Sequence, residues 1–167
     1  VREDYNEWTI DAGQFKGEDP GFADFHIVNN LDARLERKLW IHNGGHASMA
    51  YASARKGYRY VHEALQDNEI AEFTGAVLDE IGNCVFHKYP KDFTLEVIRS
   101  YEADLGRRGA IAEMKDEISR VVRDPLRKLG LHDRLLAPAV YAVSNNISCP
   151  HLIRAIVNAT LYESPAD

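Results

Sequence analysis

The stretch IAEFTGAVLDEIGNCV, residues 70–85, decides the fold class of this chain. Its large apolar side chains recur every three or four residues, at Ile70, Phe73, Val77, Ile81 and Val85. This spacing places them on one face of an α-helix, where they can pack against other helices. The pattern therefore predicts a long helix with one buried side.

Similar stripes occur in the rest of the chain: Leu95, Ile98 and Leu105; then Ile111, Met114, Ile118 and Val121; and finally Leu152, Ile153, Ile156, Val157 and Leu161. A further helix fits residues 135–143, and we expect Pro125 to end or kink the helix over 111–121. At least six helical segments follow one another with short connections and without alternating strands. The sequence predicts a mostly α, multihelical domain.

Residues 1–30 differ from the rest. They are rich in Gly, Asp and aromatic residues, and short extended pieces at 7–10 and 25–28 predict a strand or two. Asn30 is suited to cap a helix, and the leucines after it repeat at intervals of four residues. We therefore expect a linker with short strands over 1–30 and a helical domain over 31–167.

Composition narrows the class of protein. With 45% hydrophobic residues the 167-residue chain can form a core, and its net charge of −6, without a basic run, argues against nucleic acid as a partner. No apolar run approaches the ~20 residues that span a bilayer, and the opening Val1-Arg2-Glu3-Asp4 does not resemble a signal peptide. The chain opens as if it were cut from a longer protein. We expect Cys84 and Cys149 to be buried thiols of a cytoplasmic protein.

The stretch KLWIHNGGH, residues 38–46, brings an amine, a carboxamide and imidazoles together. At about 100° per residue, Lys38, Asn43 and His46 can share one polar face of a helix. Such a face suits the removal of a proton from an alcohol while another agent takes the hydride. Gly44 and Gly45 cost about 1 kcal/mol each in a helix interior, which indicates either a kink with close approach by substrate or cofactor, or tight helix packing.

The pattern Lys38-x4-Asn43-x2-His46 resembles the signature of the mannitol dehydrogenase family, the polyol-specific long-chain dehydrogenases. A second segment, from Arg123 to Leu129 and on through Arg134 to Pro138, is similar to a segment of mannitol-1-phosphate 5-dehydrogenases. The resemblance runs from about Tyr5 to Tyr162 and concerns the C-terminal, substrate-binding half of those enzymes. It implies the multihelical fold of that half.

The resemblance also implies roles: Lys38 as catalytic acid and base, Asn43 as the stabiliser of the developing alkoxide, and His46 as a substrate contact. Without it, these residues would be read as a solvated charge, a helix cap and an ordinary core or surface histidine. Two positions depart from the family. Gly44 replaces a frequent threonine, and His42 replaces a small, hydroxylated or aliphatic residue. His42 can relay a proton for Lys38, although a side chain that packs or faces solvent is the commoner case.

Basic residues gather around Pro125, with Arg120, Arg123 and Arg127 at helical spacing and Lys128, His132 and Arg134 after them. The ordinary interpretation is a surface of ion pairs with nearby acids. A phosphorylated polyol, however, needs donors for its dianion. From the family's substrate contacts we predict that Lys128, Arg134 and Arg127 bind substrate. If they contact only hydroxyl groups, the substrate is not phosphorylated.

The resemblance implies an oxidoreductase of carbohydrate metabolism that interconverts mannitol 1-phosphate and fructose 6-phosphate with NAD. Because no Gly-x-Gly-x-x-Gly follows a strand here, we expect an N-terminal Rossmann domain to bind NAD and this chain alone to be inactive. His42 and His46 have no third ligand nearby, so no metal is expected. The alternatives are a mannitol 2-dehydrogenase or hexuronate reductase domain, and a helical association module without chemistry.

Overall fold

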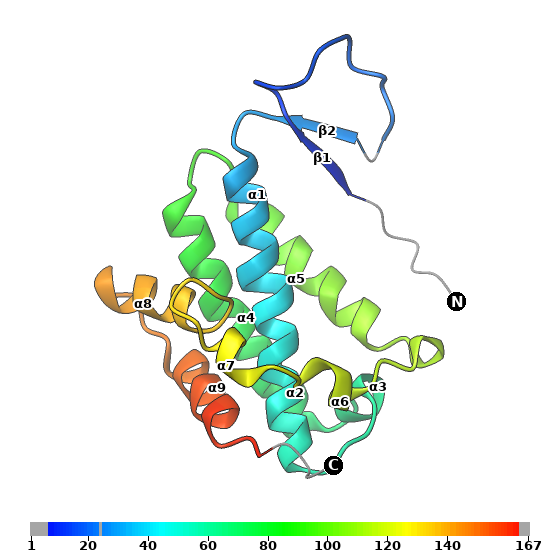
Figure 1. Ribbon diagram of the computed structural model, residues 1–167, viewed down its shortest axis with the longest axis vertical. Coiled ribbons are helices and arrows are strands. Elements are labelled where there is room, and N and C mark those ends of the chain that lie inside the picture. The colour runs from blue at the N-terminus through cyan, green and yellow to red at the C-terminus, as the bar shows by residue number, and fades with distance from the viewer. Residues whose placement is uncertain (1–6, 24, 164–167) are drawn as a thin grey trace.

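Two short parallel strands lead into a helical body in the computed structural model, which describes residues 7–23 and 25–163 (Figure 1). Strand β1, Trp8–Asp11, pairs with β2, Phe25–Val28, so that Trp8 lies opposite Phe25. Both strands were predicted, and the multihelical fold class is confirmed. The division of the chain at residue 31 stays a prediction.

One long helical rod runs through the middle of the molecule (Figure 1). It consists of α1, Leu31–Arg37, a π-helical turn η1, Lys38–Gly44, and α2, Gly45–Arg55. The Asn30 side chain accepts a hydrogen bond from the Ala33 amide at 3.1 Å, which confirms the predicted cap. The leucine repeat faces the core only in part, since Leu39 packs against it whereas Leu35 is 57% exposed.

The other helices surround this rod. They are α3, Val61–Ala64; α4, Asn68–Lys88; α5, Leu95–Gly109; the 3-10 turn η2, Ala112–Met114; α6, Ile118–Val121; α7, Pro125–Lys128; α8, Leu136–Ser144; and α9, Pro150–Thr160. Helices α4 and α9 pack on α2 and on each other. The largest fully buried side chains come from several of these elements: Trp40, Tyr51, Ile41, Ile81, Ile98, Leu135 and Leu152. Cys84 and Cys149 are buried thiols, as predicted.

The helix predicted over 111–121 is wrong. The turn η2 ends at Lys115, whose backbone is left-handed with φ 45°, and α6 begins only at Ile118. Residues 116–118 instead pair with residues 59–61, which lead into α3: the Val61 amide donates to the Asp116 carbonyl at 3.0 Å, and the Ile118 amide donates to the Arg59 carbonyl at 2.9 Å. Pro125 does not end a helix but begins α7, where its missing N–H costs nothing.

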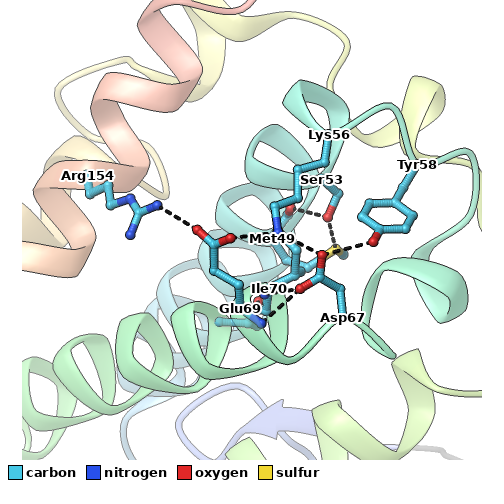
Figure 2. A network of polar contacts seen from close by, with 9 residues as sticks. Met49, Ser53, Lys56, Tyr58, Asp67, Glu69, Ile70 and Arg154 are labelled. Carbon is cyan, nitrogen blue, oxygen red and sulfur yellow. Dashed lines mark hydrogen bonds and ion pairs between the residues drawn. The ribbon is translucent and has the colours of Figure 1, made fainter.

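A polar network outside residues 38–46 joins the C-terminal end of α2, the N-terminal end of α4 and the middle of α9 (Figure 2). Asp67 caps α4 through the Glu69 amide and also accepts from the Lys56 amine at 2.7 Å and the Tyr58 hydroxyl at 2.9 Å. Glu69 pairs with Lys56 and with Arg154 of α9. Hydrogen bonds from Lys56 and Tyr58 lower the pKa of Asp67 to about 2. We assign this network to the stability of the helix ends.

Close packing explains the two adjacent glycines of the motif. A Cβ on Gly44 would lie 2.6 Å from the Arg134 carbonyl oxygen, and one on Gly45 would lie 2.4 Å from Leu78 Cδ2. Of the two alternatives left open by the sequence, the structure shows tight packing. Because the atom facing Gly44 belongs to the backbone of the basic segment, this contact sets the distance between that segment and the motif.

We expect Gly44→Ala to destabilise the chain by about 1–3 kcal/mol, because a backbone carbonyl cannot move aside as a flexible side chain can. Urea unfolding followed by circular dichroism measures this free energy. Gly75→Ala is the matched control, since a Cβ at this helical position of α4 meets no atom within 4 Å. That control should gain up to about 1 kcal/mol. A Gly44→Ala chain as stable as the parent would show that the contact is loose.

Candidate active site

The π-helical turn aligns the three motif residues. Its i→i+5 hydrogen bonds widen the turn, so that residues five apart, such as Lys38 and Asn43, become neighbours across it. His46 follows three residues later in the α-helical geometry of α2, again one turn along. Lys38 thus lies one π-helical turn before Asn43 on the rod, and His46 one α-helical turn after it. Single π-helical turns are frequent at functional sites.

A polar cavity of about 790 Å³ opens beside this face. Asn43 and His46 line it from the rod, and Lys128, Arg134 and Arg127 line it from the basic segment. Its wall also includes Lys115, Arg120 and Arg123, against only two aspartates, Asp116 and Asp124. Such a concentration of cations, in a chain of net charge −6, gives the cavity a positive potential that favours an anionic ligand. Lys38 is exposed and is not part of this wall.

Lys128 is the most unusual residue of the cavity. Its side chain is buried, at 4% exposure, and it makes no hydrogen bond or ion pair with any residue that the structure describes. Burial, and then the neighbouring Arg127 and Arg134 guanidinium groups, lower the pKa of its amine. The charges of Asp124 and Asp133 act in the opposite direction, but neither carboxylate pairs with the amine directly. An anionic ligand in the cavity that Lys128 lines would supply the missing partner.

The two arginines that flank Lys128 are held differently. Arg134 is largely buried and donates from its backbone N and its Nε to Asp133 Oδ1, both at 2.7 Å. Arg127 is more than half exposed and lies 3.7 Å from Asp133 Oδ2. Burial would raise the pKa of Asp133, but the hydrogen bonds from Arg134 outweigh it and lower the pKa. Asp133 therefore stays ionised and orients Arg134 at the cavity.

The backbone around the cavity is strained at two places. Lys115 and Asp124 both adopt left-handed conformations, with φ 45° and 56°, and both line the cavity. Neither residue is a glycine, so each conformation costs about 1–3 kcal/mol, which the surrounding structure has to offset. Such strain concentrates at functional sites. It also shapes the basic segment, because Asp124 directly precedes α7 and its Lys128.

The two histidines of the motif have separate partners. Arg108 Nη2 lies 3.1 Å from His42 Nδ1, and His46 Nε2 lies 3.1 Å from Asp116 Oδ2. Burial, followed by the charges of Arg108, His46 and Lys38, lowers the pKa of His42 to about 4. The contact with His46 outweighs burial and, with Arg120, lowers the pKa of Asp116 to about 2. At neutral pH His42 is therefore uncharged and Asp116 is ionised.

An apolar recess of about 120 Å³ adjoins the polar cavity. His42, His46, Met114 and Asp116 line both spaces, so the two histidines stand at their boundary. The His42 and His46 rings meet edge to face, with centroids 6.4 Å apart. His42 thus neither faces open solvent nor belongs to the core, which differs from the commoner case considered from the sequence.

Comparison with known proteins identifies the family of the chain. Residues 30–167 match the profile described as the mannitol dehydrogenase C-terminal domain. The chain belongs to this family. It is 40% identical over 136 residues to a mannitol-1-phosphate 5-dehydrogenase of Lactococcus lactis subsp. cremoris, covering 81% of this chain and 35% of that protein. It is 33% identical over 165 residues to a mannitol-1-phosphate 5-dehydrogenase of Clostridium acetobutylicum, covering 99% of this chain and 42% of that protein.

Solved structures show the same fold at lower identity. A Pseudomonas fluorescens mannitol 2-dehydrogenase, in a ternary complex with NAD and D-mannitol, superposes with a TM-score of 0.68 at 20% identity over 84% of this chain and 27% of the other. A D-sorbitol dehydrogenase in substrate-free form gives 0.67, also at 20% identity, over 84% of this chain and 30% of the other. The chain thus spans less than half the length of each relative, and belongs to an oxidoreductase family.

Sequence reasoning missed two polar partners of the motif. Arg108 and Asp116 lie 66 and 70 positions from the histidines that they contact, and no local pattern connects such distant residues. Asp116 also pairs with Arg120, as expected for the ordinary interpretation of the basic segment as a surface of ion pairs. Among the described residues no group of three metal-binding side chains lies together, and no described helix is long and apolar enough to cross a membrane.

Proposed function

We propose that this chain is the substrate-binding and catalytic domain of an NAD-dependent dehydrogenase that interconverts mannitol 1-phosphate and fructose 6-phosphate. One observation carries the proposal: Asn43 and His46 share a cavity with the buried, unpaired Lys128 and with Arg134. The names of the relatives from Lactococcus and Clostridium support the substrate. A sugar phosphate and NAD would also fit the cytoplasmic location expected from the sequence.

The chemistry divides between two parts of the complete protein. NAD, which the Pseudomonas enzyme binds, would supply the acceptor for the hydride of the carbinol carbon. The described residues contain only a two-stranded sheet, which offers no switch point for a dinucleotide, so we assign NAD to an N-terminal Rossmann domain. For the same reason we expect the isolated chain to be inactive.

The motif residues move the proton of the substrate hydroxyl and stabilise the negative charge that develops on its oxygen. Lys38 Nζ takes the proton of the substrate hydroxyl, Asn43 donates a hydrogen bond to the oxygen as negative charge develops, and His46 contacts a neighbouring hydroxyl. In the reverse direction, the Lys38 ammonium returns the proton to the ketose oxygen. Lys38 is exposed in this chain, so the exclusion of water from its amine has to come from the cofactor domain when it closes over the substrate.

Replacement of Arg134 tests the phosphate assignment. In the complete enzyme, Arg134→Ala should lower kcat/KM for mannitol 1-phosphate far more than for mannitol, by roughly 1.5–3 kcal/mol for the lost charge-assisted hydrogen bond. Arg154→Ala is the matched control, because this arginine of α9 is exposed and lies outside the cavity. Steady-state kinetics on both substrates decides the matter.

Equal losses on the two substrates would refute the phosphate site and favour the second candidate, a dehydrogenase of free polyols. The structural likeness to a mannitol 2-dehydrogenase favours that candidate. A hexuronate reductase domain would instead act on a carboxylated sugar, and the same cations could bind its carboxylate. An association module without chemistry would leave the cavity cations without a function.

A further inference from the structure

Two contacts, one from Arg108 to His42 and one from His46 to Asp116, decide which nitrogen of each histidine carries a proton. A guanidinium group can only donate, so His42 Nδ1, at 3.1 Å from Arg108 Nη2, has to be the acceptor. The proton of the neutral ring is then on Nε2. An ionised carboxylate can only accept, so His46 Nε2, at 3.1 Å from Asp116 Oδ2, has to carry a proton.

Each ring therefore has one further nitrogen. His42 keeps an Nε2–H donor, and neither this atom nor His46 Nδ1 has a hydrogen-bond partner among the residues that the structure describes. Both rings line the polar cavity beside Asn43. A hydroxyl group both donates and accepts a hydrogen bond, so a polyhydroxylated chain matches this pair.

We propose that His42 is a substrate-binding residue, which donates from Nε2 to a hydroxyl oxygen of the polyol chain, and that Arg108 is the positioning residue that fixes its tautomer. This inference rests on the proposed function and adds a residue to it. The phosphate end of the substrate belongs to Lys128 and Arg134, while His42 and His46 bind the hydroxylated carbons.

The surroundings of Arg108 support its positioning role. Arg107 and Arg108 are neighbours on α5, and both pair with Asp104. Arg107 is 69% exposed, whereas Arg108 is 12% exposed and turns inward to His42. Asp116 is fixed in the same way for His46, because its other oxygen pairs with Arg120 and its carbonyl accepts from the Val61 amide. Both histidine partners are thus held from outside the motif.

The tautomer can be measured without any activity. Nitrogen NMR of the chain labelled with ¹⁵N-histidine, at neutral pH, should show His42 as a neutral ring protonated on Nε2. Arg108→Met should remove this preference, and Arg108→Lys, which keeps a donor, should restore it. Arg107→Met is the matched control and should leave the spectrum of His42 unchanged. A charged His42, or one protonated on Nδ1, in the parent chain would overturn the proposal.

Kinetics of the complete enzyme tests the contact with substrate. His42→Leu should raise KM for mannitol 1-phosphate roughly five- to tenfold, the size of one lost hydrogen bond, with a change in kcat below about twofold. His42→Gln, whose amide can donate from the position of Nε2, should recover most of the loss. His26→Leu, at an exposed position of β2, controls for loss of a histidine elsewhere.

The outcomes separate the two proposals. If the complete enzyme oxidises no polyol, the proposed function fails, whatever the tautomer of His42. If it oxidises polyols but His42→Leu leaves KM unchanged, or His42→Gln is no better than His42→Leu, only the role of His42 is refuted.

Discussion

Replacement of Lys38 by methionine should lower kcat of the complete enzyme at least about 100-fold, the usual size of a general acid–base effect. The amine that takes the hydroxyl proton would be lost, while the cavity that binds the substrate stays intact, because Lys38 is not part of its wall. KM should therefore change much less than kcat. Steady-state kinetics in both reaction directions measures the two constants.

Two further variants sharpen this test. Lys38→Arg keeps the positive charge but cannot release its proton near neutral pH, so it should be almost as slow as Lys38→Met. Lys91→Met removes another exposed lysine and should leave the rate unchanged. If Lys38→Met retained most of the parent rate, Lys38 would be only a solvated charge, and another group would have to accept the proton.

Much of the fold follows from local patterns. The stripe over residues 70–85 lies within α4, and the extended pieces lie at β1 and β2, because each pattern directly reflects the period of its element. The helix over 111–121 fails because its apolar spacing says nothing about the pairing of residues 116–118 with the chain before α3. That pairing, between segments far apart in sequence, interrupts the helix at Lys115.

The candidate site, like the fold, can be predicted from the sequence only where local patterns determine it. The spacing of Lys38, Asn43 and His46 is visible in the sequence, and so is the basic segment. The burial of Lys128 is not, because a lysine in a charged segment is ordinarily exposed. The π-helical turn is also hidden, since the sequence of residues 38–44 fits an ordinary α-helix as well. Its observed packing, with Gly44 against the Arg134 carbonyl, depends on tertiary structure.

Replacement of Asn43 by alanine should slow kcat by roughly 2.7–4 kcal/mol of barrier, as other donors to developing oxyanions do, with a smaller effect on KM. Asn43 is half-buried at the wall of the polar cavity and one π-helical turn from Lys38. A hydrogen bond to the substrate oxygen strengthens as the proton leaves and negative charge develops, so its loss falls mainly on the transition state. Steady-state kinetics of the complete enzyme separates the two effects.

Asn43→Asp provides the sharper comparison, because the carboxylate has nearly the same shape but replaces the donor with a negative charge. It should be at least as slow as Asn43→Ala, whereas Asn29→Ala, at an exposed position, should have no effect. The double variant of Lys38 and Asn43 should lose less than the sum of the single losses, because both groups serve one oxygen. A raised KM with unchanged kcat would instead make Asn43 a binding residue, and strictly additive losses would mean that the two side chains act on different atoms of the substrate.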